Sequence, residues 1–400
     1  MVSFGNLLVI KTQIGIVGAG PAGLLLAHLL HLDGISSVIV ETKSREFVEQ
    51  RVRAGVLEHG SVDLLNAIGV GERMRKEGLI HEGVEFLFQG RRHRIHFRDL
   101  IGRCITVYGQ QEVVKDLIQA RLKAGGRILF EAEAVTLSGL DSDRPAIRYR
   151  DPNGEGEILC DFIAGCDGFH GVSRTSIPPG VLRLYERVYP FAWLGILAQA
   201  PPASEELIYS NHERGFALLS MRSPAITRLY LQCAPDEDLS EWPDERIWRE
   251  LQTRLGCAPD FRLTEGPILQ KGVTPMRSFV AEPMQYGRLY LAGDAAHIVP
   301  PTGAKGMNLA IADVRVLSRA LQSYYAAGSS AGLAAYSQTC LRRVWRAQHF
   351  SWWMTSMLHR SDGPYSEFDY RRQLAELENI VTSRAAAGNL AENYVGLPIE

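Results

Sequence analysis

The chain has 400 residues, 46% of which are hydrophobic, and its formal net charge at pH 7 is -2. This length and composition can bury a large core and predict roughly two or three interlocked domains. The charge leaves no basic surplus that would favour nucleic acid as a partner, and no apolar stretch of the sequence is long enough to span a membrane.

The six cysteines are scattered without a CxxC pair or Cys/His pairing. This pattern is typical of reduced, mostly buried residues in a cytoplasmic protein, so we expect neither a disulfide nor a metal site. The apolar N-terminus lacks the preceding basic segment of a signal peptide. We expect residues Met1–Val9 to form a loosely held extension.

In chain order, the first predicted elements are a buried strand, a glycine-rich turn, a helix and a second strand that ends in an acid: Ile14–Val17, Gly18-Ala-Gly20-Pro-Ala-Gly23, Leu24–Leu32, Ser37–Val40 and Glu41. The first glycine permits a tight turn, the second lets the backbone approach a pyrophosphate, and the third allows close packing of the helix. Glu41 lies 18 residues past Gly23 and can accept hydrogen bonds from ribose hydroxyls. Together these elements predict an ADP-containing cofactor, without distinguishing FAD from NAD.

Helices and short strands alternate in the next part of the chain. A helix is expected over Glu58–Met74, and alternating apolar residues around Gln89-Gly90 predict a β-hairpin over residues 84–97, outside the nucleotide-binding core. The following elements are a helix, antiparallel strands and a buried strand that leads into Asp167: Gln110–Ala124, Ile128–Phe130, Ala146–Tyr149, Gly156–Leu159 and Asp161–Cys166.

From Tyr189 onward, longer β-rich runs predict a second sheet. A sheet inserted between two halves of a nucleotide-binding domain creates an interface cleft, where substrates commonly bind. Helices dominate from Ala310 to the end. The expected strands of the sheet, the helix after them and the returning strand are Phe191–Ala198, Glu206–Tyr209, Gly215–Met221, Thr227–Gln232, Asp244–Leu255 and Arg277–Val280.

The most informative segment is a Gly-Asp turn that follows an apolar strand. Leu289–Ala292 directs Asp294 out of its C-terminal end, where α/β sheets bind ligands and where a carboxylate can accept hydrogen bonds from sugar-alcohol hydroxyls. Pro300 and Pro301 fix the turn, and the helix beginning near Gly306 directs its partially positive N-terminus to the same place. The pattern favours a flavin, although a turn into an ordinary helix also uses proline and glycine.

Three motifs, Gly18 to Gly23, Cys166-Asp167-Gly168 and Gly293-Asp294, resemble those of the single-component FAD aromatic hydroxylases. Between about Lys11 and Pro398, longer segments resemble the members of that family that hydroxylate 4-hydroxybenzoate. These segments are Arg51 to Glu58, Ile163 to Arg174, Ala295 to Lys305, Ser351 to Ser356 and Ala391 to Pro398. The resemblance implies a mixed α/β (α+β) fold with a Rossmann-like FAD-binding domain, an inserted β-sheet substrate domain and a C-terminal helical region.

The resemblance also implies a division of the chain and a reaction. The FAD-binding domain would span residues 1–183, with the hairpin facing the substrate side, and the substrate domain residues 184–276. Residues 277–320 would return to the FAD domain, and residues 321–400 would form the helical region. A cytoplasmic homodimer with tightly bound, non-covalent FAD would convert 4-hydroxybenzoate, O2 and NADPH or NADH to 3,4-dihydroxybenzoate and water through a flavin C4a-hydroperoxide.

The resemblance assigns the aromatic acid to the second sheet and the chain end. Ser220, Arg222 and Tyr230 match the family's clamp for the carboxylate. Ser220 and Arg222 share a strand face because they lie at i and i+2. Tyr209 and Tyr394 match the tyrosines that contact the phenol oxygen and pass its proton outward, a task that suits a group which both donates and accepts.

His81 matches the residue at the outer end of the proton path, where an imidazole that titrates near neutrality could exchange protons with solvent. Pro301 would face the substrate oxygen with its backbone carbonyl. Without the resemblance, a strand arginine more often forms a surface ion pair, a tyrosine packs its ring, and a histidine beside Glu82 lies on the surface.

The flavin would be held by the Gly18–Gly23 loop and by side chains spread along the chain: Glu41, Arg53, Gln110, Asp167 and Asp294. Lys305 and Asn308 would lie close to flavin and substrate, where the Lys305 charge favours phenolate and reduced flavin anions. Arg228 resembles the arginine linked to flavin movement between a buried and an exposed position.

NADPH would bind transiently across a surface groove, because the sequence has no second GxGxxG. The implied phosphate contacts are Arg51, His170, Arg174 and Arg277. The family's NADPH-specific pattern of Arg-Gln and a later Tyr is replaced by Thr42-Lys43 and Phe47, although Lys43, Arg45 or both could meet a 2′-phosphate. We expect use of either coenzyme, with NADPH slightly ahead.

Alternative functions stay open at this point. A related hydroxylase for 3-hydroxybenzoate or 4-aminobenzoate is disfavoured by the set of tyrosines, serine and arginine described above. An FAD-binding protein that senses an aromatic acid would form a complex without turnover. A nicotinamide dehydrogenase would leave Asp294 without a task.

Overall fold

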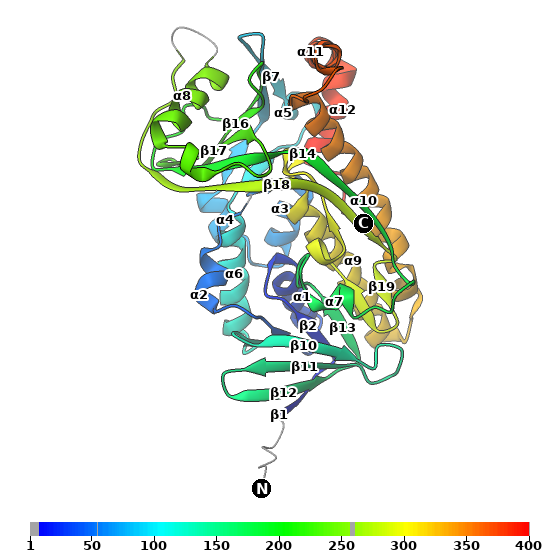
Figure 1. The fold of residues 1–400 in the computed structure, drawn as a ribbon. Helices are drawn as coiled ribbons and strands as arrows, with labels where there is room; N and C mark the ends of the chain where they lie inside the picture. Colours follow the sequence, from blue (N-terminus) through cyan, green and yellow to red (C-terminus); the bar gives the residue numbers. More distant parts are fainter. Residues whose placement is uncertain (1–7, 54, 257–260, 400) are drawn as a thin grey trace.

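The computed structural model describes residues 8–53, 55–256 and 261–399. Figure 1 shows an α/β region in the lower half of the molecule, a second β-rich region above it, and the long helix α10 (Ala331–Leu358) extending along one side. The predicted fold class, a mixed α/β fold with a helical C-terminal region, is confirmed.

The first large sheet contains, in spatial order, β19 (Gln285–Tyr286), β20 (Leu289–Leu291), β13 (Phe162–Gly165), β2 (Ile14–Val17), β3 (Ser37–Val40) and β9 (Arg127–Leu129). All residues of β2, β3, β13 and β20 are buried, as expected when helices cover a parallel sheet. The helix α1 (Pro21–Leu32) packs against α6 (Gln110–Lys123) and α9 (Gly306–Ala327). The predicted strand, glycine turn, helix and second strand are confirmed.

The strand predicted at Ile128–Phe130 exists as β9, but the expected antiparallel pairing is wrong because β9 pairs in parallel with β3. The chain reaches β9 through α6, and a helical crossover returns to a sheet in the original direction. The other predicted strands of this region do pair antiparallel. They form a separate sheet of β1 (Leu8–Lys11), β12 (Gly154–Leu159), β11 (Ala146–Asp151) and β10 (Glu133–Ser138).

The predicted N-terminal extension is wrong for Leu8 and Val9. Both belong to β1, which pairs in parallel with β12. Residues 1–7 of the predicted extension lie outside the described residues.

The single helix predicted over Glu58–Met74 is wrong. Two helices, α3 (His59–Ala67) and α4 (Glu72–Glu77), occupy this segment. Gly69 lies between them with φ of 80°, a conformation that ends α3 and that residues with a Cβ rarely adopt.

The second large sheet contains, in spatial order, β21 (His297–Ile298), β18 (Ile268–Glu282), β14 (Arg183–Ala198), β17 (Ile226–Cys233), β16 (Ala217–Ser223), β15 (Ile208–Asn211), β6 (Gly83–Phe88) and β7 (Arg91–His96). The predicted sheet is confirmed, although β15 begins later than expected. The predicted hairpin is also confirmed as β6 and β7, and it joins this sheet because β6 pairs in parallel with β15. The long β18 crosses the domain bound that we place at 276, while β14 begins at the bound at 183 (Figure 1).

Helices form the C-terminal region and cover the sheets. The helix α10 packs on α9, and α12 (Arg384–Val395) packs on α11 (Ser366–Thr382) and α5 (Phe97–Ile101). A small sheet contains β4 (Val56–Leu57), β8 (Ile105–Val107) and β5 (Leu79–His81). The remaining short helices are α2 (Arg45–Gln50), α7 (Val172–Thr175), η1 (Leu239–Glu241), η2 (Gly293–Ala295) and η3 (Pro301–Gly303).

Within the described residues, most cysteines are buried, as the sequence predicted. Of these cysteines, Cys104 is half-buried and the others are buried, while Cys257 lies outside the described residues. Within the same ranges, we find no helix with the length and apolar character needed to cross a membrane.

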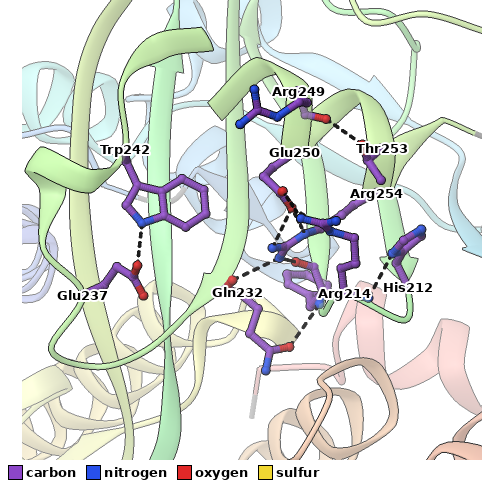
Figure 2. A network of polar contacts seen from close by, with 10 residues as sticks. His212, Arg214, Gln232, Glu237, Trp242, Arg249, Glu250, Thr253 and Arg254 are labelled. Carbon is purple, nitrogen blue, oxygen red and sulfur yellow. Dashed lines mark hydrogen bonds and ion pairs between the residues drawn. The ribbon is translucent and has the colours of Figure 1, made fainter. Parts of the chain in front are cut away.

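The helix α8 (Asp244–Leu255) lies where the sequence predicted it. A network of ion pairs and hydrogen bonds connects it to the second sheet (Figure 2). Glu250 accepts hydrogen bonds from Arg214 and Arg254, and Glu250 and Arg254 are only 5% and 6% exposed. Arg254 also donates to the backbone oxygen of Gln232 on β17 at 3.0 Å. Because buried charges are costly without partners, this network specifies how α8 lies on the sheet.

Candidate functional site

The C-terminal ends of β2, β3, β13 and β20 meet at one edge of the first sheet because these strands are parallel. The glycine-rich turn follows β2, and Glu41, Asp167 and Asp294 follow the other three strands. Open α/β sheets bind ligands at this edge. Predicted cofactor residues from distant parts of the chain therefore gather along one line of strand ends.

The glycine-rich turn has two crowded positions and one open position. Gly18 has φ of 101°, and a Cβ there would lie 2.4 Å from the backbone oxygen of Cys166. A Cβ on Gly23 would lie 2.0 Å from the backbone oxygen of Gly18, whereas a Cβ on Gly20 would meet no heavy atom within 4 Å. The protein's own packing thus explains the outer glycines, and the open middle glycine fits a backbone cradle for a phosphate group.

Three carboxylates border this cradle. Glu41 accepts hydrogen bonds from the backbone nitrogens of Ala19 at 2.7 Å and Lys43 at 2.8 Å, so it also shapes the glycine turn. Asp167 accepts one from the Ser173 nitrogen at 2.8 Å, while its buried Oδ1 finds no partner among the described residues. An unpaired buried oxygen is costly, so Asp167 and the glycine cradle fit a hydroxyl-bearing, phosphate-containing cofactor such as FAD.

Asp294 lies in the Gly-Asp turn, where it is exposed to solvent but partly desolvated by neighbouring protein atoms. This desolvation raises the pKa of Asp294, and the opposing charges of His297, Arg53 and Arg51 compensate only in part. The helix α9 begins at Gly306, as predicted. Pro301 is exposed in η3, and its carbonyl oxygen accepts a hydrogen bond from the Ala304 nitrogen at 3.0 Å.

A buried pair beneath the Gly-Asp turn was not predicted from the sequence. Asp313 on α9 accepts hydrogen bonds from the Gly293 nitrogen at 3.0 Å and from the His297 ring at 2.6 Å. Burial opposes protonation of His297, but the Asp313 carboxylate raises the pKa of this imidazole overall. The sequence did contain a signal for this pair, because Asp313 lies among apolar residues of α9. An aspartate is seldom buried without a partner.

The proposed carboxylate clamp occupies neighbouring strands of the second sheet. The Arg222 Nη1 lies 3.4 Å from the Ser220 Oγ, so the predicted shared face is confirmed. The Tyr230 hydroxyl lies near the guanidinium groups of Arg222 and Arg228, and the Arg228 guanidinium carbon lies 5.1 Å from the centroid of the Tyr230 ring. Burial alone would raise the pKa of Tyr230, but these two guanidinium groups lower it overall.

Two guanidinium nitrogens of this cluster remain available. The buried Arg222 Nε and Arg228 Nη1 have no hydrogen-bond partner among the residues that the structure describes. Gly195 on the adjacent β14 leaves room for Arg228, because a Cβ at Gly195 would lie 2.7 Å from the Arg228 Nη2. Arg222 also donates to the backbone oxygen of Arg53 at 3.3 Å, which joins the clamp to the exposed loop bearing Arg51 and Arg53.

The Tyr209 and Tyr394 hydroxyls form a hydrogen bond, although the two residues lie 185 positions apart in the chain. Both side chains are buried, at 2% and 1% exposure. Desolvation raises the pKa of each, so both phenols are neutral at physiological pH. The Tyr394 ring packs against Phe97 and Phe350, with centroid distances of 5.3 and 6.2 Å.

His81 lies in a different environment from the surface position considered in the sequence. It is 1% exposed on β5, and neither ring nitrogen has a hydrogen-bond partner among the described residues. Desolvation lowers the pKa of His81 to about 4, so the ring is neutral near pH 7 and does not titrate near neutrality as expected. Its place on a proton path stays a prediction.

Lys305 and Asn308 bind a neighbouring segment in this structure. The Lys305 Nζ donates to Glu58 Oε1 at 2.6 Å and to the Tyr394 backbone oxygen at 3.0 Å. The Asn308 side chain accepts from the Glu58 nitrogen at 2.9 Å and donates to the Val56 oxygen at 3.0 Å. Sequence reasoning missed Glu58, whose charge offsets the positive potential expected from Lys305.

The residues predicted to contact a nicotinamide coenzyme differ in accessibility. Arg51, His170 and Lys43 are exposed, and Gln110, predicted for FAD, is half-buried at the start of α6. The half-buried Arg277 pairs with Glu186 at 3.3 Å and packs over the Phe169 ring. Arg174 donates to the backbone oxygens of Ala295 and Phe169, which links the turn after β13 to the Gly-Asp turn. Coenzyme contacts of these side chains stay predictions.

Comparison with known proteins agrees with this geometry. A family model described as an FAD binding domain matches residues 11–351. The chain is 49% identical over 391 residues to p-hydroxybenzoate hydroxylase of Acinetobacter baylyi, a match that covers 98% of this chain and 96% of that protein. It is 26% identical to 3-(3-hydroxy-phenyl)propionate/3-hydroxycinnamic acid hydroxylase of Mycobacterium avium, over 76% of this chain and 53% of that protein.

Solved structures show the same fold. The crystal structure of p-nitrophenol 4-monooxygenase PnpA from Pseudomonas putida matches with a TM-score of 0.83 and 17% identity, covering 98% of this chain and 99% of that chain. A complex of aklavinone-11 hydroxylase with FAD and aklavinone matches with a TM-score of 0.73 and 21% identity, covering 87% and 69%.

The different surroundings of Gly20 and Gly23 predict different effects of alanine. Gly23→Ala should lower the free energy of unfolding of the FAD-free protein by about 3 kcal/mol, because its Cβ overlaps backbone. Gly20→Ala should change it by no more than about 0.5 kcal/mol but reduce the FAD bound after purification. Urea unfolding and flavin absorbance would measure the two effects; equal destabilisation by both variants would contradict this interpretation of the turn.

The pair of Asp313 and His297 predicts a pH-dependent contribution to stability. Because the folded-state pKa of His297 is raised above 6.5, the contribution is fully present below pH 6.5 and is lost as the pH rises through the folded-state pKa. Asp313→Asn should lower the free energy of unfolding by about 3 kcal/mol at pH 6 and remove this decline. Urea midpoints between pH 6 and 9 would test it, and an unchanged pH dependence would exclude the pair as its source.

Proposed function

This chain belongs to the p-hydroxybenzoate hydroxylase family of FAD-dependent aromatic monooxygenases, and we propose that it converts 4-hydroxybenzoate, O2 and NADPH or NADH, with one proton, to 3,4-dihydroxybenzoate, water and the oxidised coenzyme. The observation that carries the proposal is the buried contact between the Tyr209 and Tyr394 hydroxyls. It supplies a neutral donor and acceptor for a phenol, in the same region as an arginine cluster suited to a carboxylate.

Ser220, Arg222 and Tyr230 would bind the substrate carboxylate. The unpaired Arg222 Nε and Arg228 Nη1 support this assignment, because a buried donor without an acceptor is costly and an anion would satisfy it. The two guanidinium groups that lower the pKa of Tyr230 would also favour an anionic ligand.

Tyr209 and Tyr394 would bind the phenol oxygen and remove its proton. Because desolvation keeps both hydroxyls protonated, each can accept a proton on one side while it donates another, without holding a charge. Loss of the phenol proton increases electron density on the ring carbon next to the oxygen, which is the carbon to be hydroxylated. The Pro301 carbonyl would orient the same oxygen, and His81, which burial keeps neutral, would lie at the outer end of the proton path.

The strand-end carboxylates and the glycine turn would hold FAD, with Gly20 at its pyrophosphate, Glu41 at the adenosine ribose and Asp294 at the ribityl chain. Arg53, Gln110 and Asp167 would complete its site, near Lys305 and Asn308. Arg228 would accompany movement of the cofactor. When bound, FAD supplies the transfer of two electrons from the coenzyme and the activation of O2.

The reduced coenzyme would bind across the surface that bears Arg51, Lys43 and His170, with Arg277 and Arg174 at its border. Because the exposed Lys43 could contact a 2′-phosphate, which only NADPH carries, we expect a slight preference for NADPH over NADH. The resemblance of the sequences further supports a cytoplasmic homodimer.

Product identification tests this function. The purified yellow protein, incubated with 4-hydroxybenzoate, O2 and either coenzyme, should form 3,4-dihydroxybenzoate, with slightly higher catalytic efficiency for NADPH. Coenzyme oxidation that yields only peroxide would indicate an uncoupled hydroxylase, and the absence of stimulated oxidation would indicate an aromatic-acid sensor. A large preference for NADH would contradict the coenzyme order alone.

Tyr209→Phe removes the hydroxyl that would contact the phenol while retaining the ring. We expect the dissociation constant of the substrate to change less than about threefold and the hydroxylation rate to fall at least about 100-fold, because proton transfer is lost. Rapid-mixing kinetics and product yield would measure this. Tyr365→Phe, at a side chain that is 74% exposed, is the matched control; an unchanged product yield in Tyr209→Phe would remove Tyr209 from the mechanism.

A further inference from the structure

His359 occupies a buried position where the C-terminal end of α10 meets the second sheet. Its side chain is 2% exposed, and both ring nitrogens have partners. The Trp193 Nε1 donates to the His359 Nε2 at 2.7 Å, and the His359 Nδ1 lies 2.9 Å from the Thr355 oxygen. The site described above includes neither His359 nor Trp193.

The partners determine the protonation of the ring. An indole nitrogen can only donate, so the His359 Nε2 must accept, and a carbonyl oxygen can only accept, so the Nδ1 must carry the hydrogen. Desolvation lowers the pKa of His359 to about 3, which keeps this neutral form across the physiological range. The His359–Trp193 hydrogen bond therefore has one direction and does not change with pH near neutrality.

His359 also belongs to a stack of aromatic rings. It lies between Phe191 and Phe216, with centroid distances of 4.6 and 4.4 Å and interplanar angles of 8° and 24°. The Trp193 ring is nearly parallel to Phe216 at 5.1 Å. Such distances allow direct ring packing, so the four rings form a continuous aromatic stack where the second sheet meets the end of α10.

The aromatic stack contacts Tyr230, which we assign to the substrate carboxylate, and Tyr209, which we assign to the phenol oxygen. The Trp193 ring lies 4.7 Å from the Tyr230 ring, whose hydroxyl lies near the guanidinium groups of Arg222 and Arg228. Phe216 lies 6.3 Å from the ring of Tyr209. A change in the plane of Trp193 or Phe216 would therefore be transmitted to Tyr230 or Tyr209.

The backbone around His359 is itself anchored to several elements. The Gln373 Nε2 on α11 donates to the His359 oxygen at 2.7 Å, and Asn211 on β15 donates to the Met357 oxygen at 3.0 Å. The next residue, Arg360, exchanges two hydrogen bonds with the side chain of Gln232, a residue seen in Figure 2. The position of the imidazole is thus determined by α10, α11 and two strands together.

We propose that His359 is a positioning residue for the aromatic-acid site, because it holds the plane of Trp193, which in turn supports Tyr230. Through Phe216 it supports Tyr209 as well. Its hydrogen bond acts on Trp193 and through it on the clamp residue Tyr230, whereas its support of Tyr209 is by ring packing alone. Loss of the hydrogen bond should therefore weaken binding more than it slows the chemical step. The positioning role rests on the proposed function.

The test compares holoenzyme variants that alter the hydrogen bond separately from the ring. His359→Phe keeps an aromatic ring in the stack but removes the acceptor, whereas His359→Gln returns an acceptor near the position of Nε2. Trp193→Phe removes the donor from the other side and serves if His359→Phe fails to fold. His349→Phe, at an exposed histidine on the same helix, is the matched control.

We expect His359→Phe and Trp193→Phe each to weaken binding of the aromatic acid, raising both its dissociation constant and its Michaelis constant about tenfold, with kcat changed less than about twofold. His359→Gln should remain within about threefold of the wild type, and His349→Phe should equal it. The double variant should bind no more weakly than either single variant, because both remove the same bond. Tryptophan emission should shift in His359→Phe as the indole loses its acceptor.

Wild-type affinity in His359→Phe or in Trp193→Phe would overturn the positioning role and leave the proposed function in place. Equal losses in His359→Gln and His359→Phe would also overturn it, because the acceptor would then be irrelevant. If the wild-type holoenzyme does not bind 4-hydroxybenzoate, both the proposed function and the positioning role fail.

Discussion

The antiparallel pairing of β14 with β18 is the constraint on which the candidate site depends. Their register extends from Arg183 opposite Glu282 to Ala198 opposite Ile268, so the same two strands belong to the region of the Gly-Asp turn and to the substrate sheet. The register shifts between Val188 and Ala192, where Pro190 cannot donate to a neighbouring strand. Because β18 also pairs with β21, which follows the Gly-Asp turn, the two parts of the site have a defined separation.

Buried charge follows a consistent pattern around this framework. Glu58 with Lys305, and Asp313 with His297, are pairs that neutralise each other and support loops of the nucleotide region. The clamp differs because Arg222 and Arg228 surround Tyr230 with an excess of positive charge and unused donors. The paired residues Glu58, Lys305, Asp313 and His297 thus support the backbone. The arginine nitrogens without a partner lie where we expect an anionic ligand to bind.

Part of the site could be predicted because its residues act through local rules. The spacing of Gly18, Gly20 and Gly23 between a strand and a helix requires only short-range geometry, and the structure shows why the outer two positions exclude a Cβ. The two-residue alternation that placed Ser220 beside Arg222 is equally local. The single helix predicted across Gly69 was wrong because a local apolar pattern was extended past a residue that ends a helix. The antiparallel pairing predicted for β9 was wrong because strand direction depends on pairing with β3, which is distant in the sequence.

The sequence by itself determined the class of cofactor, the order of the elements and the residue types available to an aromatic acid, because these follow from motifs and periodicities shorter than one element. Only the tertiary structure decided which side chains meet. It joined the hydroxyls of Tyr209 and Tyr394 across 185 positions, buried His81, and directed Lys305 to Glu58. Such contacts depend on packing and desolvation contributed by several elements at once, so no periodicity within a single segment can specify them.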